Sequence, residues 1–407
     1  MDAKELHPAN SPHLHVDEAR MFDAKLEGNY DLHDEAHSPP YAAGRKEYFE
    51  RPPSSGGNRG GRLLGSRLQP SVTISDNSSE VFCAQFSPDG KLLAAGCADG
   101  AIRIFSVSTG KLAYNLQTGT SVSLPTTSLR FRPAIAQTKT RNVLVSVNAS
   151  GAIQHWHITS GKCLSTIEEE DQFYALDYRP DGGVFAAAGK DKTIRIYDET
   201  TKHEVMQLQG GTGYGTSSAP GHSNRVFSIK FHPRDPEIVL TGGWDNTVQF
   251  WDMRVRHSVR SIYGPHISGD ALDLCEDEVL TGSWRPENAL EVWDYGSGEL
   301  ISSIPWSSRT GGASQPAQPT LLYAAQFSSR ADGGRYIAAG GSGANEAKVF
   351  DHAGGDRLVG TITGLSRGVF TLDFSPADEA KKLAVAGGDA SIRIIDIVEE
   401  HVDDDVY

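Results

Sequence analysis

The sequence contains little cysteine, no long apolar run and no excess of basic residues. Its 407 residues include four cysteines, Cys83, Cys97, Cys163 and Cys275, and no two of them form a Cys-X-X-Cys motif. This spacing argues against a zinc-finger pattern and favours reduced thiols in an intracellular protein. No stretch approaches the length of a membrane span, and the first residues form no apolar signal core, so neither membrane insertion nor secretion is predicted.

The charge balance and the periodicity narrow the class further. Lys and Arg number 38 against 52 Asp and Glu, which gives a formal net charge of −14. An acidic chain argues against a nucleic-acid platform, where basic patches dominate. No window shows a sustained helical stripe, whereas period-two alternation recurs, as in Thr193-Ile194-Arg195-Ile196-Tyr197. The sequence therefore predicts an all-β fold.

What the sequence does contain is a repeat. The clearest copy runs from Gly221 to Asp252, GHSNRVFSIKFHPRDPEIVLTGGWDNTVQFWD. It combines a Gly-His start, an aromatic-X-Pro turn, a small-residue pair, an acid and a strand ending in Trp-Asp. A period of roughly 40 residues with these features is typical of four-stranded propeller blades. We expect seven copies, at residues 81–116, 129–167, 173–208, 221–262, 271–304, 321–362 and 369–397.

These copies resemble the WD40-repeat family over about four fifths of the chain. The resemblance implies a seven-bladed β-propeller, a fold that displays partners more often than it catalyses reactions. The seventh copy lacks a fourth strand after Ile397, which would leave an open sheet edge. We expect Val72–Ser75 to fill that place and close the ring, as in WD40 propellers. The predicted propeller spans residues 70–398, followed by an acidic tail at 399–407.

The N-terminal extension, residues 1–69, has no apolar periodicity. Residues 1–37 are rich in acids and residues 38–69 in bases. Two interpretations stay open: a disordered tail, or a docking arm that orders along a partner. The candidate anchors of such an arm are Tyr30, Tyr41, Tyr48, Phe49, Leu63 and Leu64. His13 and His15 lack further ligands nearby, so neither a metal site nor a cofactor is predicted.

One blade position predicts a binding site. Four residues before the residue that ends each first strand stand Phe82, Thr127, Tyr174, Phe227, Asp270, Tyr323 and Phe370. Radial repetition should place them in a ring, and in the WD40 family this position lies at the channel mouth, where some members hold a peptide side chain. Five aromatic rings beside one acid predict a basic side chain as the ligand. The alternative is that the rings only plug the channel.

A second set of residues could be mistaken for a catalytic triad. His222, Thr241, Asp245 and Trp251 combine a histidine, a hydroxyl and an acid in the fourth copy. The acid recurs with the blade period as Asp99, Asp191 and Asp389, and a nucleophile would not repeat in this way. We therefore predict a structural tetrad and no catalytic residue. The glycine-rich run at 211–215 precedes neither a Lys-Ser/Thr pair nor a helix, so it is no phosphate loop.

Two features point to particular partners. The segment Val239 to Arg254 is similar to the Trp-Asp-X-Arg motif of WD40 substrate receptors of cullin-type ubiquitin ligases, where Arg254 would face the adaptor. The fifth copy departs from this motif at Trp293–Gly296. The segment 263–273 resembles one in WD40 proteins of flagellate eukaryotes. Two insertions, at 209–220 and 305–319, are expected on the mouth face, either as recognition loops or as plain linkers.

Three classes of function are open to such a chain. The sequence favours a non-enzymatic, cytoplasmic scaffold for protein partners within a larger assembly, with a cytoskeletal or ciliary complex as the expected setting, and without small-molecule, membrane or nucleic-acid ligands. The alternative is a substrate receptor of a cullin-type ligase through Arg254. A propeller enzyme would need several acids or histidines converging at the channel, and Asp270 is the only acid among the seven mouth positions.

Overall fold

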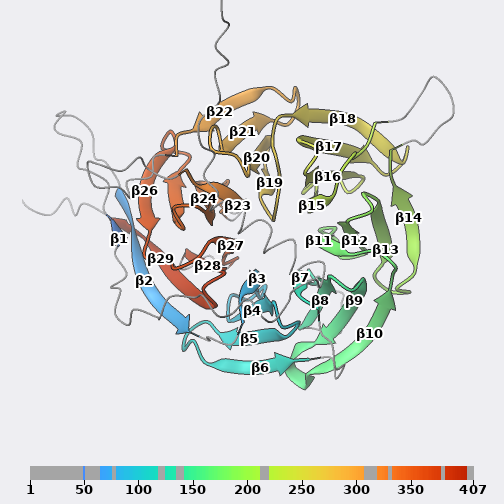
Figure 1. Cartoon of the computed structure of the whole chain (residues 1–407), viewed down its shortest axis with the longest axis horizontal. Helices are drawn as coiled ribbons and strands as arrows, with labels where there is room; N and C mark the ends of the chain where they lie inside the picture. Colours follow the sequence, from blue (N-terminus) through green and yellow to red (C-terminus); the bar gives the residue numbers. More distant parts are fainter. Residues whose placement is uncertain are drawn as a thin grey trace, which may run out of the picture.

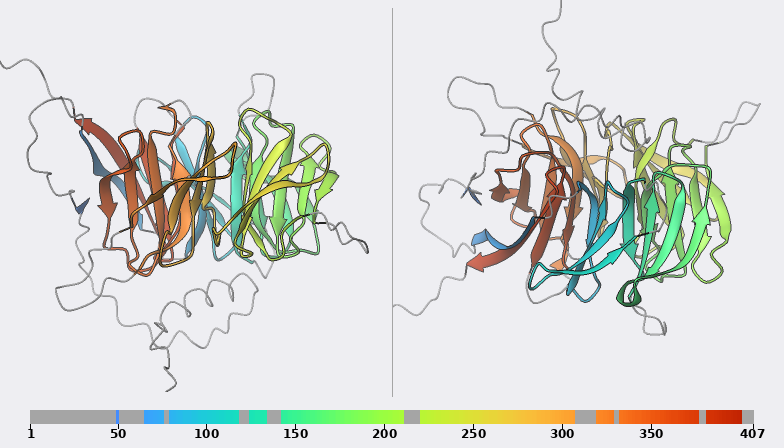
Figure 2. Two further views of the ribbon diagram at one scale, coloured as in Figure 1. Left: turned by 90° about the horizontal axis from the view of Figure 1, so that it is seen from above. Right: turned by 60° about the horizontal axis from the view of Figure 1, so that its bottom comes forward.

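The computed structural model describes nine segments of the chain. They are residues 49–50, for which only the backbone is described, 65–75, 79–117, 124–133, 142–210, 220–306, 319–328, 332–376 and 381–400. Within them the chain folds into seven antiparallel sheets arranged around a central axis (Figure 1). Figure 2 shows this ring edge-on, with the strands running between its two faces.

Each sheet is one blade, and the blades are numbered in chain order. The strands of each blade are given from the innermost to the outermost. Blade one holds β3 (Val81–Phe86), β4 (Leu92–Cys97), β5 (Ile102–Ser106) and β6 (Leu112–Leu116). Blade two holds β7 (Thr126–Phe131), β8 (Val143–Asn148), β9 (Ala152–His157) and β10 (Lys162–Glu168). Blade three holds β11 (Phe173–Tyr178), β12 (Val184–Gly189), β13 (Ile194–Asp198) and β14 (Glu204–Leu208). A 3₁₀ turn, Ile158–Ser160, follows β9.

The remaining blades follow the same order. Blade four holds β15 (Val226–Phe231), β16 (Ile238–Gly243), β17 (Thr247–Asp252) and β18 (His257–Tyr263). Blade five holds β19 (Leu272–Cys275), β20 (Glu278–Gly282), β21 (Leu290–Asp294) and β22 (Leu300–Ile304). Blade six holds β23 (Leu321–Phe327), β24 (Tyr336–Ser342), β25 (Ala347–Asp351) and β26 (Arg357–Ile362), with β1 (Phe49–Glu50) outside β26. Blade seven holds β27 (Val369–Phe374), β28 (Lys382–Gly387) and β29 (Ser391–Glu400), and its outer strand is β2 (Gly65–Ser75).

The small-residue pair of the repeat has a steric reason. Four blades have a glycine at or near the end of the second strand. A Cβ added to this glycine would lie against a backbone carbonyl oxygen at the start of the first strand of the same blade. At Gly189 that Cβ would lie 1.7 Å from Gln172 O, and at Gly387 it would lie 2.0 Å from Gly368 O. Gly243 and Gly341 are in the same situation. Only glycine allows this close approach. The small-residue pair therefore marks where the second strand of a blade passes the start of its first strand.

The ring is closed by its first and last described long strands. β2 pairs antiparallel with β29 through ten residue pairs, from Gly65 with Glu400 to Ser75 with Ser391. The expected segment, Val72–Ser75, lies within this strand. The strand begins at Gly65, before the expected domain start at 70, and β29 continues to Glu400, past 398. The acidic residues 401–407 lie outside the described part.

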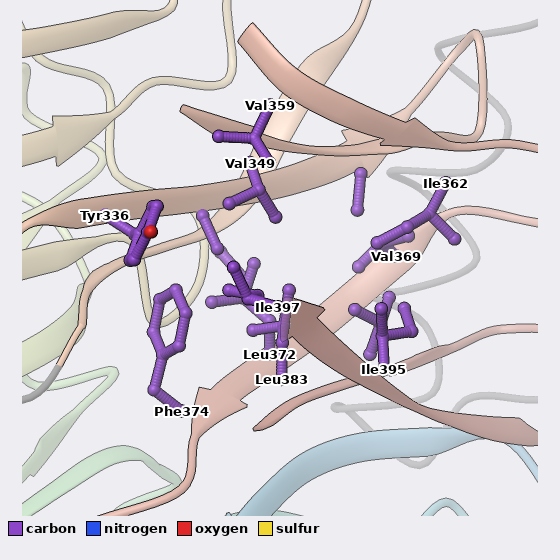
Figure 3. Close-up of a cluster of buried hydrophobic side chains, with 14 of the residues drawn as sticks. Tyr336, Val349, Val359, Ile362, Val369, Leu372, Phe374, Leu383, Ile395 and Ile397 are labelled. Carbon is purple, nitrogen blue, oxygen red and sulfur yellow. The ribbon is translucent and has the colours of Figure 1, made fainter. Parts of the chain in front are cut away.

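The core consists of layers between neighbouring blades. In the layer shown in Figure 3, Tyr336, Val349 and Ile362 of blade six meet Leu383 and Ile395 of blade seven. Leu68 of the closing strand packs against the same cluster. The closing strand therefore adds side chains to the core as well as backbone hydrogen bonds, and burial of this apolar surface stabilises the ring.

Most of the N-terminal extension lies outside the described part of the chain. The exception beyond β2 is β1, where Phe49 pairs with Ile362 and Glu50 with Thr361 on the outer edge of blade six. A docking arm was expected to order along a partner, whereas this short piece pairs with the propeller of its own chain. Among the described residues, no helix is long and apolar enough to cross a membrane.

Candidate functional site

The seven predicted mouth residues converge. The inner strands of all blades begin on the same face, here called the mouth face, so residues at or next to their starts lie together around the channel there. All seven line one narrow cavity of about 40 Å³: Phe82, Thr127, Tyr174, Phe227, Asp270, Tyr323 and Phe370. A water needs roughly 10–15 Å³ of such space, so the cavity has room for a few waters. The mouth is narrow because the rings fill it.

The aromatic rings form a continuous arc that extends beyond the predicted set. Tyr174 stacks on Phe227 at 4.9 Å between ring centroids, and Phe227 stacks on Trp244 at 5.0 Å. The arc continues through His266, Trp284, Tyr323 and Phe370 to Phe82, with steps of 6.2, 6.4, 6.5, 5.4 and 5.7 Å. It is open at blade two, where Thr127 donates its hydroxyl to the Phe173 carbonyl at 2.6 Å.

Three members of this arc are half-exposed and were not predicted. Trp244 and Trp284 lie in the turns after the second strands of blades four and five, and His266 lies in the connection between these blades. Arg225 lies over the Trp244 ring, 5.2 Å from its centroid. Burial lowers the pKa of His266, whose Nδ1 lies 2.7 Å from Asn246 Oδ1. The arc thus presents two indoles and a neutral imidazole on the mouth face.

Asp270 is not an unpaired acid. Its Oδ2 accepts a hydrogen bond from Arg130 at 2.6 Å, and its Oδ1 lies 3.0 Å from Ser228 Oγ and 3.3 Å from Lys230 Nζ. Burial alone would raise the pKa of this carboxyl, but Lys230 and Arg130 hold it well below its usual range. The 38% of the side chain that is exposed faces the channel cavities. Two cations of the protein therefore already neutralise the predicted anchor for a basic ligand.

A second ring of polar residues lies deeper in the channel. Each blade contributes one residue near the end of its first strand to this ring, in the order Gln85, Arg130, Asp177, Lys230, Asp273, Gln326 and Asp373. It is the penultimate residue in every blade except blade five, where Asp273 is followed by two more strand residues. These residues line a polar chamber of about 220 Å³, which shares Arg130 and Asp270 with the mouth cavity. Arg130 and Lys230 therefore contact Asp270 across the channel, at the level between the mouth cavity and the polar chamber.

Five members of the polar ring connect neighbouring blades. Their side-chain oxygens accept the backbone N–H of the last residue of the next inner strand: Gln85 from Phe131, Asp177 from Phe231, Asp273 from Phe327, Gln326 from Phe374, and Asp373 from Phe86, at 2.7–3.0 Å. Burial raises the pKa of Asp373 to about 7. Sequence reasoning missed this ring, although a polar residue three positions after each predicted mouth residue was its visible signal.

The predicted tetrad is present in blade four. His222 Nδ1 lies 2.8 Å from Asp245 Oδ2, and its Nε2 lies 2.7 Å from Thr241 Oγ1. Trp251 donates its indole N–H to the same hydroxyl at 2.7 Å. His222, Thr241 and Trp251 are buried, and the four groups form one hydrogen-bonded chain from Asp245 through His222 and Thr241 to Trp251. The set connects a turn to two strands, and its hydroxyl is engaged on both sides.

Other blades place different polar pairs at the position of the tetrad's acid. The recurring acids Asp99, Asp191 and Asp389 each pair with an arginine four residues later. In blade six, where this position is Ala344, the buried Glu346 accepts hydrogen bonds from Trp306 and Thr320 instead. Among the described residues, no group of three or more His, Cys, Asp or Glu side chains could hold a metal ion.

Arg254 lies in the turn between β17 and β18, on the face opposite the mouth. Its guanidinium is 63% exposed and binds both oxygens of Asp252, at 2.9 and 2.6 Å. In blade five the corresponding Asp294 instead accepts bonds from Ser297. The two insertions at 209–220 and 305–319 lie almost wholly outside the described residues, so their role stays a prediction.

Seven four-stranded blades around a polar channel, closed by an N-terminal strand, define a β-propeller. Family comparison agrees: the WD domain, G-beta repeat model matches residues 161–198 and 215–252, and the model of the WD40 domain of anaphase-promoting complex subunit 4 matches residues 62–131. The chain is a WD40-repeat β-propeller. The matches at 161–198 and 215–252 begin before the first strands of blades three and four and end with their third strands, and the first of them includes β10 of blade two, so this sequence repeat is offset by one strand from a blade.

Several curated proteins are similar to parts of the chain. The periodic tryptophan protein 2 homolog of Dictyostelium discoideum is 27% identical over 43% of the chain and 18% of its own length. Protein transport protein SEC31 of Saccharomyces cerevisiae is 26% identical over 60% of the chain and 20% of its length. The target of rapamycin complex subunit wat1 of Schizosaccharomyces pombe is 26% identical, over 62% of the chain and 73% of its length.

The matched region thus spans only about a fifth of the length of the first two relatives. The similarity to WD40 proteins, including subunits of multiprotein complexes, fits a protein-interaction scaffold, a role typical of the WD40 fold.

Proposed function

We propose that this chain is a non-enzymatic scaffold subunit that recruits a protein partner through its mouth face. The observation that carries this proposal is the arc of eight rings, with Trp244, His266 and Trp284 half-exposed at its outer side. Indole rings offer a large, rigid contact area with a polar edge, which is why tryptophan is enriched at the centres of protein interfaces.

The position of the rings matters more than the charge of Asp270 in this proposal. A ligand cation at the channel mouth would compete with Arg130 and Lys230 for Asp270, and any displaced cation would be left largely buried without a partner. Binding of a basic side chain remains the prediction of the sequence. The ring faces of Trp244 and Trp284 require no such displacement, so they are proposed as the primary contact.

The test is native co-purification with the full chain and single alanine variants. Trp244→Ala and Trp284→Ala should each reduce recovery of the partner at least ten-fold. Tyr263→Ala is the matched control, because this aromatic residue is 74% exposed on the outer strand of blade four, away from the channel. Melting temperatures would verify folding. Equal partner recovery with all three variants would refute the proposal.

We further propose a cytoplasmic location within a cytoskeletal or axonemal assembly. Support comes from the segment 263–273, because it resembles a segment of WD40 proteins of flagellate eukaryotes. In the fold this segment contributes His266 and Asp270 to the mouth. A tagged chain expressed in a flagellated cell should remain with the axoneme after detergent extraction. Complete release of the chain with soluble proteins would contradict this location.

The second candidate is a cullin-ligase receptor, which the exposure of Arg254 favours. Its contact with Asp252 orients the guanidinium at the surface, where an adaptor could bind it. Arg254→Ala should abolish capture of the adaptor, whereas Arg234→Ala, 54% exposed in another turn of the same face, should not. If neither variant changes adaptor capture, the motif is only a blade turn.

A further inference from the structure

The polar chamber of the channel is the larger of the two central spaces, and it reaches the face opposite the mouth. Its volume is about 220 Å³, against about 40 Å³ for the mouth cavity, and a single water needs only roughly 10–15 Å³ of such space. Pro180 lines the chamber and is exposed in the turn after β11, on the face opposite the mouth. The chamber is therefore accessible from that face, without passage through the aromatic rings.

The wall of the chamber is short of positive charge. Two cations, Arg130 and Lys230, face four carboxylates: Asp177, Asp270, Asp273 and Asp373. Both cations contact Asp270, and Arg130 also approaches Asp177, with Nε 3.5 Å from Oδ1. Within the described part of the chain, Asp273 and Asp373 form no ion pair. With all six groups ionised, four acids against two cations leave the wall with a net charge of −2.

The protonation of Asp373 reflects this shortage. Burial raises the pKa of its carboxyl to about 7, and the attraction of Arg130 and Lys230, which form no ion pair with it, offsets only part of that effect. Near neutral pH such a carboxyl takes up a proton, which removes one uncompensated negative charge from the chamber. A ligand cation beside Asp373 would supply the missing positive charge and release that proton.

The oxygens of the carboxylates select the kind of cation. Asp177 and Asp273 each use Oδ2 to accept a backbone N–H of another blade, at 2.8 and 2.9 Å. Asp273 Oδ1 accepts no hydrogen bond from the described residues, whereas Asp373 accepts one at each oxygen. A guanidinium binds best to two oxygens of one carboxylate, and neither Asp177 nor Asp273 has both available. An ammonium is a compact charge that can use single oxygens from several groups.

We propose that the polar chamber binds a primary alkylammonium group, with Asp273 Oδ1 as its principal acceptor and Asp177 and Asp373 as further negative charges on the wall. This is the chemistry of a lysine side chain on a partner protein or of a free diamine. The site opens on the face opposite the arc of rings, so it does not depend on the proposed function of the mouth face.

The first experiment compares ligands on the unaltered full chain by titration calorimetry. The probes are the Nα-acetyl methylamides of lysine, arginine and norleucine, together with 1,5-diaminopentane. The lysine derivative or the diamine should bind at least ten-fold more tightly than the arginine and norleucine derivatives. Tighter binding of the lysine derivative would identify a side chain as the source, and tighter binding of the diamine a free amine. Absence of binding, or equal binding of the lysine and arginine derivatives, would overturn the proposal.

The same titration has a pH readout. Between about pH 6 and about pH 8 the lysine ammonium stays charged while Asp373 loses its proton, so binding should become tighter as pH rises. Proton release on binding, measured at about pH 7 in buffers of different ionisation enthalpy, should accompany the change. Binding that is independent of pH would show that the ammonium does not lie near Asp373.

The second experiment tests the principal acceptor. Asp273→Asn keeps a side-chain oxygen for the Phe327 N–H but loses the negative charge, so it should weaken binding of the better probe at least ten-fold. Asp277→Asn is the matched control, because that carboxylate lies in the turn after β19 on the same face, is 74% exposed and does not line the chamber. Melting temperatures would verify folding. Equal affinities of the two variants would overturn the assignment of Asp273.

Discussion

Asp270 shows how the surroundings of one residue change its role. In the sequence it is the single acid among seven mouth positions, whereas in the fold it lies between Arg130 and Lys230. Those two cations come from blades two and four, and their approach to blade five depends on the radius of the channel. The blade period predicts which positions face the axis, but not which side chains reach across it.

Asp270→Asn should therefore destabilise the fold by about 1–3 kcal/mol, because the largely buried Arg130 and Lys230 lose their carboxylate partner, while the exposure of Asp270 to the channel reduces the cost. The free energy of unfolding in urea would measure this loss. Asp277→Asn is the control, since that carboxylate pairs with Arg234 but is 74% exposed and should cost under about 0.5 kcal/mol. Equal stability of Asp270→Asn and the parent would show that the ion bridge contributes nothing.

A second residue-scale prediction concerns Thr241. Thr241→Val would leave the buried Nε2 of His222 and the indole N–H of Trp251 without their shared partner. We expect a loss of roughly 2–3 kcal/mol in unfolding free energy. Thr281→Val in blade five removes the partner of the Trp293 indole N–H and a long bond, 3.4 Å, to the Glu291 carbonyl, but leaves no histidine unpaired, so it should cost less. A similar loss in both variants would mean that His222 gains nothing from the hydroxyl.

At the scale of elements, periodic features were predictable and irregular ones were not. Strand alternation and the Gly-His and Trp-Asp signals predict the seven blades, and the missing fourth strand predicts the closure. The arc members Trp244, His266 and Trp284 lie in turns and a connection, outside the period of the first strands. Their stacking depends on how neighbouring blades are placed. The same holds for Glu346, which replaces the expected acid from two positions farther along the chain.

Blades five and six are joined by an ionic contact that should depend on pH. Hydrogen bonds to Glu278 on β20 and to Asp356 in the turn before β26 raise the pKa of His352 to about 9. A histidine whose folded pKa exceeds its unfolded value near 6.5 stabilises the fold fully below that value, and the contribution disappears as pH rises through 9.

The parent chain should therefore lose about 3 kcal/mol of unfolding free energy from this group between roughly pH 6.5 and 9. Urea unfolding at a series of pH values would measure the loss. His352→Gln should be less stable at pH 6 and should lack this part of the pH dependence. A parallel pH profile in the two proteins would show that His352 is not protonated in the folded state.

At the scale of the whole molecule, the closing strand determines where the chain can be shortened. Deleting residues 1–64 removes β1 but leaves every residue of β2, so the melting temperature should change by less than about 2 °C. Deleting residues 1–78 removes β2 and exposes the edge of β29, together with the core around Leu68 and Ile74. This should lower the melting temperature by roughly 5–10 °C or more. Equal melting temperatures would show that β2 does not hold the ring closed.

The closure by β2 also affects the order in which the propeller folds during its synthesis. β2 leaves the ribosome before all seven inner strands, and its partner β29 begins at Ser391, more than 300 residues later. At about 5–20 residues per second, the two strands are separated by roughly 15–60 s of synthesis. During this interval β2 is an unpaired strand, while blades one to six can already form. Joining of the ring is therefore one of the last events in the biogenesis of the propeller, and a chaperone that shields an unpaired strand would act before it.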